Sequence, residues 1–129
     1  MKFIEKIPPR VFTLNPNEPI ATDFYDCGEI HLKDNELISF KTDSNKSYDI
    51  TKKNFGYYAT PSLNGRLKDQ GFKSALIKNS SNRFYLLLVE NNPEKLNQFF
   101  TYLKNDLQQL VCWLDEEDNL KKIDAIFTT

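Results

Sequence analysis

The side chains best suited to binding lie close together in the run 55–66. This run offers hydroxyl, amide and guanidinium groups within ten residues: Tyr57, Tyr58, Thr60, Ser62, Asn64 and Arg66. A guanidinium holds a carboxylate or phosphate through two parallel hydrogen bonds. Hydroxyls and aromatic faces beside it suit a polar organic ligand such as a sugar or sugar phosphate. Because binding sites tend to lie on loops held by strands, we predict these six residues as a ligand-binding site.

The same run also has a purely structural interpretation. Glycine, proline and asparagine are residues that turns use, and the run contains Gly56, Pro61 and the pair Asn64 and Gly65. Its large apolar and aromatic side chains would then belong to the core: Phe55, Tyr57, Tyr58 and Leu63. The exposure of these side chains decides between the two interpretations.

Positive charge is concentrated in the middle of the chain. Residues 41–83 hold nine Lys or Arg and three Asp or Glu, whereas residues 1–40 hold four and seven, and residues 84–129 hold four and eight. The formal net charge of −1 therefore conceals a basic segment between two acidic ones. This asymmetry predicts an anionic small molecule or protein partner. It also allows a homo-oligomer in which the acidic end of one copy meets the basic middle of another.

One part of the basic segment points to single-stranded nucleic acid. The run 52–58, Lys-Lys-Asn-Phe-Gly-Tyr-Tyr, resembles the aromatic RNA-contact strand of cold-shock domains. The resemblance implies aromatic side chains that stack on bases and lysines that hold phosphates. The second aromatic motif of that family has no counterpart, because residues 83–90 are mostly aliphatic. Nucleic-acid binding is therefore an alternative and not the principal prediction, since the chain as a whole is acidic.

Metal, nucleophilic and cofactor chemistry have less support. Cys27, Glu29 and His31 alternate along one expected strand and are possible zinc ligands, but no second ligand cluster follows. His31 is the single histidine available as a catalytic base, and no nucleophile signature surrounds any Ser or Cys. The four glycines are isolated, so neither a phosphate-binding loop nor a dinucleotide fingerprint is present. We expect no metal and no cofactor.

The bulk composition predicts a small globular protein. A chain of 129 residues with 40% hydrophobic and 13% aromatic residues suits one domain with one core. Its two cysteines form no disulfide framework, which favours a reducing, cytoplasmic location. The first residues carry charges where a leader peptide would be apolar. No apolar run approaches the length of a membrane span, so we expect no membrane association.

Most of the elements that would hold these residues are expected to be strands. Apolar runs between polar turns predict extended segments at 10–14, 20–32, 37–42, 47–51, 72–78 and 83–90, with a turn at 15–19. Pro8 and Pro9 are expected to separate an N-terminal arm (1–9) from the first strand. The stretch 55–72 is predicted to be a loop or irregular hairpin and not a helix, and the apolar run 84–89 is predicted to be the central strand.

One long helix is predicted over 92–110. Asn92 is suited to cap it and Pro93 to its first position, and large apolar residues recur along one face at helical spacing. Residues 111–114 extend this helix or form a last strand, and residues 115–129 comprise an acidic, solvated loop and a short terminal helix or tail. The whole chain, 1–129, is predicted to be a single α+β domain. Its mostly antiparallel sheet of five to seven strands carries the long C-terminal helix.

These observations favour a small cytoplasmic binding or accessory protein without catalysis of its own. It would contact an anionic ligand or protein partner through the run 55–66. Two alternatives stay open. One is a single-stranded nucleic-acid binder that uses Phe55, Tyr57 and Tyr58 with the flanking lysines. The other is a small enzyme that acts on a polar metabolite such as a sugar phosphate, with Arg66 orienting an anionic group.

Overall fold

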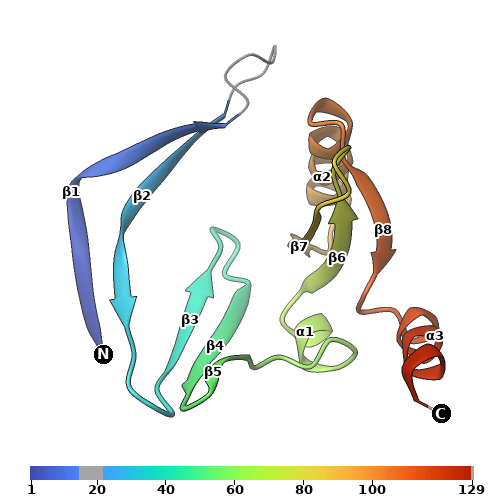
Figure 1. Cartoon of the computed structure of the whole chain (residues 1–129), viewed down its shortest axis with the longest axis horizontal. Coiled ribbons are helices and arrows are strands. Elements are labelled where there is room, and N and C mark those ends of the chain that lie inside the picture. The colour runs from blue at the N-terminus through green and yellow to red at the C-terminus, as the bar shows by residue number, and fades with distance from the viewer. Residues whose placement is uncertain (15–21, 129) are drawn as a thin grey trace. The chain divides into compact units, whose positions relative to one another are not determined.

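The computed structural model describes residues 1–14 and 22–128, which form mostly strands (Figure 1). The strands are β1 (Lys2–Leu14), β2 (Thr22–His31), β3 (Leu37–Lys41), β4 (Ser47–Lys53), β5 (Gly56–Ala59), β6 (Phe72–Lys78), β7 (Phe84–Glu90) and β8 (Gln109–Trp113). The helices are α1 (Arg66–Asp69), α2 (Pro93–Asn105) and α3 (Glu117–Phe127). The predicted α+β class with mostly antiparallel pairing is confirmed. The predicted number of strands, five to seven, was too low, since the described residues already form eight strands in three sheets. The turn expected at 15–19 lies outside the described residues.

The chain divides into two compact units. Unit 1 comprises Met1–Ile38 and Thr51–Tyr58, and unit 2 comprises Ser39–Ile50 and Ala59–Thr129. The strands β3, β4 and β5 form one sheet in that order and contribute residues to both units. The single globular domain over 1–129 stays a prediction.

Unit 1 contains a two-stranded antiparallel ribbon made of β1 and β2 (Figure 1). The expectation that Pro8 and Pro9 end the first extended segment was wrong, because β1 runs through them to Leu14. The register between the two strands shifts between Glu5 and Arg10, on either side of the prolines. Proline has no N–H to donate to a neighbouring strand, so the ladder is interrupted there while the chain stays extended.

Unit 2 contains a three-stranded antiparallel sheet in the order β7-β6-β8. The expectation that 84–89 forms the central strand was therefore wrong. After α2 the chain returns and pairs β8 with the free side of β6, so β6 becomes central and β7 lies at the edge. The start of β7 is accordingly exposed at Phe84 and Leu86, whereas Ala75 and Ile77 of β6 are buried.

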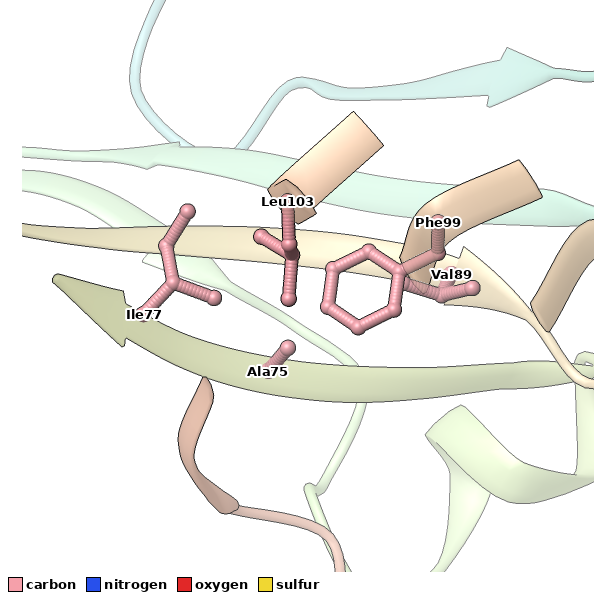
Figure 2. Close-up of a cluster of buried hydrophobic side chains, with 5 residues drawn as sticks. All are labelled: Ala75, Ile77, Val89, Phe99 and Leu103. Atoms are coloured by element: carbon pink, nitrogen blue, oxygen red, sulfur yellow. The ribbon is translucent and has the colours of Figure 1, made fainter. Parts of the chain in front are cut away.

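The buried core of unit 2 lies between α2 and one face of this sheet. Figure 2 shows its five side chains, two from α2 and three from the sheet: Ala75, Ile77, Val89, Phe99 and Leu103. Trp113 of β8 packs against the same cluster, with its ring centroid 5.4 Å from that of Phe99. The helix begins as predicted, because the Asn92 side chain accepts a hydrogen bond from the backbone N–H of Lys95 at 2.9 Å.

The predicted helix over 92–110 is too long by about one turn. Helix α2 ends at Asn105, and Leu107 adopts a left-handed backbone conformation with φ of 53°. The backbone N–H of Gln108 then donates to the carbonyl of Leu103 at 2.8 Å, and that of Leu107 donates to Lys104 at 3.4 Å. This is the Schellman arrangement that ends many helices. Glycine usually holds the left-handed position, so a leucine there leaves no signal in the sequence.

The C-terminal elements are a strand and a short helix. Of the two alternatives for 111–114, the structure forms a strand, β8, and the terminal segment forms α3. The expectation of a solvated loop at 115–118 was wrong for Asp115, which is 1% exposed. Its carboxylate accepts hydrogen bonds from the backbone N–H of Ser74 at 2.8 Å and from Lys73 at 3.2 Å. Asp115 therefore ties the end of β8 to the start of β6.

Candidate functional site

A tight turn after β5 carries the second half of the predicted site. The hydroxyl of Ser62 accepts a hydrogen bond from the backbone N–H of Arg66 at 2.8 Å, and its carbonyl accepts one from Leu67 at 3.0 Å. These bonds satisfy N–H groups that the start of a helix leaves without partners. Leu67 is fully buried and anchors α1. The expectation that 55–72 contains no helix was therefore wrong, because Asn64 and Gly65 lead into the helical turn α1 at Arg66–Asp69.

Asp49 is a buried carboxylate beside this turn, with 3% of its surface exposed. It accepts hydrogen bonds from the hydroxyl of Ser39 at 2.6 Å, from the side-chain amide of Gln70 at 3.1 Å and from the guanidinium of Arg66. The carboxylate thereby connects β3 and β4 with α1 and the residue that follows it. We call these four residues the Asp49 cluster: Ser39, Asp49, Arg66 and Gln70.

The hydrogen bonds and charges of the cluster keep Asp49 ionised. The bond from Ser39 lowers the pKa of Asp49 most, followed by the bond from Gln70 and the charges of Arg66 and Lys41, whereas burial raises it. Two cations therefore act on one buried anion. The surface side of the cluster is left with an excess of positive charge, carried by the exposed residues Arg66 and Lys41.

The six predicted residues are divided between the two units. Tyr57 and Tyr58 belong to unit 1, whereas four belong to unit 2: Thr60, Ser62, Asn64 and Arg66. Within unit 2, Asn64 donates a hydrogen bond to Glu117 at 2.8 Å, and the hydroxyl of Ser62 accepts from the backbone of the turn. The backbone N–H of Thr60 donates to the carbonyl of Asp49 at 3.2 Å. Arg66, whose side chain is 50% exposed, combines a defined position with access to solvent.

The aromatic side chains of the run lie at the surface. Phe55, Tyr57 and Tyr58 are 77%, 66% and 52% exposed. The interpretation that assigned them to the core is therefore wrong for these three residues, and also for Leu63, which is 36% exposed. Their place in the chain explains the exposure, because Phe55 lies at the turn between β4 and β5, and β5 follows at the edge of its three-stranded sheet.

A second polar group, around Glu90 at the end of β7, was missed by reasoning from the sequence. Glu90 accepts hydrogen bonds from the hydroxyls of Ser44 and Thr42, and these bonds, followed by the charges of Lys95 and Lys46, lower the pKa of Glu90. It lines an open pocket of about 390 Å³ whose apolar part includes Phe99. Thr42 and Glu90 are 48 residues apart in the chain, so no spacing rule could have joined them.

The possible zinc ligands on β2 do not form a metal site. His31 lies 3.1 Å from Glu29, and Cys27 is an exposed free thiol. Within residues 1–14 and 22–128, no group of three or more His, Cys, Asp or Glu side chains is placed to hold a metal ion. No helix in those residues has the length and apolar character that crossing a membrane requires.

Comparison with known proteins found no match for this chain. No family model, no curated protein and no solved structure matches it. The case for a function therefore depends on the residues described above, and the Asp49 cluster is the most completely defined polar arrangement that contains a residue predicted from the sequence.

Proposed function

We propose that this chain is a small binding protein without catalysis of its own, and that Arg66 contacts an anionic group of its ligand or partner. The observation that carries the proposal is the geometry of Arg66. One of its N–H groups donates to the buried carboxylate of Asp49, while half of the side chain is exposed. A guanidinium has five N–H donors in a rigid plane. Holding one edge of that plane leaves the other donors oriented for a carboxylate or phosphate.

The charges around the cluster support an anionic ligand. Lys41 adds a second positive charge close enough to lower the pKa of Asp49, and both cations are exposed. An anion that approaches Arg66 therefore meets two positive charges and one negative charge that is already hydrogen-bonded. Because Ser39 and Gln70 also hold the carboxylate, Arg66 can bind a second anion without leaving Asp49 unsatisfied.

A thermal-shift experiment tests this proposal with three anionic probes: inorganic phosphate, a hexose phosphate and a glutamate-rich peptide. A ligand that binds only the folded state raises the melting temperature. We expect at least one probe to raise the melting temperature of the wild type, and to lose this effect in Arg66→Ala. Lys68→Ala is the matched control, because Lys68 is an exposed cation of the same helical turn.

Three results would distinguish a role of Arg66 in binding the anion from a role only in stabilising the fold. Arg66→Lys keeps the charge but loses the planar pair of donors, so it should bind more weakly than wild type and more tightly than Arg66→Ala. Lys68→Ala should bind like wild type. If Arg66→Ala and wild type respond equally to a probe that binds, or if none of the anions binds, Arg66 is a structural residue and the proposal fails.

A second candidate function, single-stranded nucleic-acid binding, is favoured by the exposed aromatic side chains. Phe55 and Tyr57 present more than half of their surface to solvent in the same hairpin as Lys52 and Lys53. Stacking on such residues contributes about 1–3 kcal/mol per base. Retention of a labelled single-stranded oligonucleotide at low salt, lost as salt is added and in Tyr57→Ala, would support this candidate. Equal binding by wild type and Tyr57→Ala would remove it.

A further inference from the structure

Among the described residues, strand β7 has one unpaired edge. In the sheet order β7-β6-β8 it pairs with β6 alone, in a constant register. The backbone N–H of Asn91 donates to the carbonyl of Gly71 at 2.9 Å, and at the other end of the strand the N–H of Asn79 donates to Arg83. Because bonded and non-bonded pairs alternate in an antiparallel ladder, the odd-numbered residues of β7 bond to β6. The backbone groups of its even-numbered residues therefore point outward, at Phe84, Leu86 and Leu88.

The open pocket of about 390 Å³ runs along this edge. Four consecutive residues of β7, 87–90, line it. Successive strand residues point to opposite faces, so all four can line one pocket only along the edge of the strand. Helix α2 contributes one face, with the spacing i, i+3, i+4, i+7: Lys95, Gln98, Phe99 and Tyr102. We call this space the β7–α2 trough, and its apolar lining includes Val89 and Phe99 of the core cluster (Figure 2).

An extended peptide is the occupant that the edge and the trough fit together. A row of outward N–H and C=O groups on a strand is satisfied by another extended chain, whose alternate side chains enter the pockets beside it. A peptide paired with β7 directs every second side chain to the face of Leu87 and Val89, which is the face that α2 covers. Apolar side chains at those positions contact Phe99 and Tyr102 in the trough.

The charges at the start of β7 indicate an acidic residue in the peptide. Residues 73–89 include three Lys or Arg and no Asp or Glu. Lys78 pairs with Phe84, and Arg83 directly precedes it, so two of these cations lie at the start of the edge. At the other end two cations balance two carboxylates: Lys46, Lys95, Glu90 and Glu94. An acidic peptide residue is therefore favoured beside Arg83.

We propose that the edge of β7 and the β7–α2 trough bind an extended peptide of a partner protein, with apolar side chains at alternate positions and an acidic residue beside Arg83. Every residue that forms the edge and the trough belongs to unit 2. The proposal does not depend on anion binding by Arg66. It explains why β7 has the uncharged run Phe-Tyr-Leu-Leu-Leu-Val at an unpaired edge, a composition that natural edge strands usually avoid.

Fluorescence anisotropy on the full chain tests the proposal with a labelled peptide, Glu-Thr-Val-Thr-Phe-Thr-Val-Thr-Glu. Its apolar residues alternate with threonine, and an acidic residue at each end allows pairing in either direction. We expect a Kd of about 10–100 µM, because the trough is open and the peptide loses its freedom on binding. The same peptide with lysine at both ends should bind about threefold more weakly.

Methylation of the peptide's backbone nitrogen atoms tests the strand pairing itself. Successive N–H groups of an extended chain point to opposite sides, so methyl groups on one alternate set remove the donors that face β7. That peptide should bind about tenfold more weakly, because several hydrogen bonds are lost. The peptide methylated on the other set should bind like the unmodified one. The protein is the same in both measurements, so the comparison does not depend on how a variant folds.

Three variants examine the protein side. Leu86→Pro removes an outward N–H of β7 and no bond to β6, since proline is accepted at a strand edge, and should weaken the unmodified peptide about tenfold. Tyr102→Ala removes one wall of the trough and should weaken it about fivefold. Thr101→Ala is the control, because Thr101 is the exposed neighbour of Tyr102 in α2 outside the trough, and it should bind like wild type.

Any of three results would overturn the proposal. The first is no binding of the unmodified peptide at about 1 mM. The second is equal affinity of the two methylated peptides, which would mean that the peptide does not pair with one edge of β7. The third is a wild-type dimer in sedimentation velocity that Leu86→Pro dissociates, because the edge would then belong to a second copy of this chain.

Discussion

Replacing Asp49 with alanine removes an acceptor that three side chains share: Ser39, Arg66 and Gln70. Hydrogen bonds to charged groups contribute about 1.5–3 kcal/mol each when buried, and less where water can replace the partner. Ser39 and Arg66 are partly exposed, so water can replace these partners in part, and we take a value below that range, about 1 kcal/mol for each of the three donors. We therefore expect Asp49→Ala to lower the free energy of unfolding by about 3 kcal/mol.

Asp49→Asn is the matched control because it keeps the size of the side chain and removes its charge. An asparagine here can turn its amide oxygen toward Arg66 and Gln70 and its amino group toward the hydroxyl of Ser39. That hydroxyl accepts as well as donates, so all three partners stay satisfied. Only the charge assistance of the bonds is lost, and we expect Asp49→Asn to cost about 1 kcal/mol.

Urea unfolding followed by tryptophan fluorescence measures both values. The single tryptophan, Trp113, packs against Phe99 in the core of unit 2, the unit that holds Asp49. For a chain of this size, 3 kcal/mol corresponds to roughly 10 °C in melting temperature. If the free energy of unfolding of Asp49→Ala lies within about 0.5 kcal/mol of the wild-type value, the carboxylate does not stabilise the turn that leads into α1. If Asp49→Asn lowers the free energy of unfolding as much as Asp49→Ala does, the stabilisation comes from the charge of Asp49 and not from the acceptor that the three donors share.

The pH dependence gives an independent check on the role of the charge. The pKa of Asp49 in the folded protein lies below its ordinary value, mainly because Ser39 and then Gln70 donate hydrogen bonds to it. The unfolded chain therefore takes up the proton at a higher pH than the folded one. The stabilisation is fully present above the unfolded pKa of about 4 and is lost as the pH falls through the folded pKa. The difference between wild type and Asp49→Asn should shrink below about pH 4, and a constant difference down to pH 2 would contradict a charge effect.

Three further substitutions test other parts of unit 2, each by urea unfolding. Leu103→Ala removes a buried side chain of α2 and should cost about 2–4 kcal/mol through lost burial and a cavity; a cost under 1 kcal/mol would mean that the helix is not packed on the sheet as described. Asn92→Ala removes the cap of α2 and should cost about 1 kcal/mol, whereas Asn92→Asp should cost little. Asp115→Ala leaves the buried N–H of Ser74 without an acceptor and Lys73 without its carboxylate, and should cost about 3–5 kcal/mol; a neutral result would mean that water replaces the carboxylate.

Local sequence signals predicted the elements whose causes are local. Alternating apolar residues indicated the antiparallel strands, and the pair Asn92 and Pro93 located the start of α2 to the residue. The end of the same helix was missed because Leu107 adopts a left-handed conformation without being glycine. Its neighbours, held by hydrogen bonds from the preceding turn, impose that conformation, and composition does not reveal it.

In the candidate site, too, the features with local causes were predicted and the contacts between distant residues were not. Arg66, in α1, was predicted from its residue type and its neighbours, but its partner Asp49 lies 17 residues away in strand β4 and was not singled out. The same limit explains Glu90, whose partner Thr42 is 48 residues distant. Buried polar groups find their partners through the chain's folding, and a single sequence does not report those pairings.

The sequence by itself determined the α+β class, the antiparallel strands and the start of α2, and it singled out Arg66 by its chemistry. These depend on periodicity, capping and residue type, which act over a few residues. The tertiary structure alone decided that β6 and not β7 is central, that Asp115 is buried, and that Phe55 and Tyr57 are exposed. Each of these depends on which distant segment lies beside a residue, because burial and hydrogen-bond partners are properties of the packed chain and not of its neighbours in sequence.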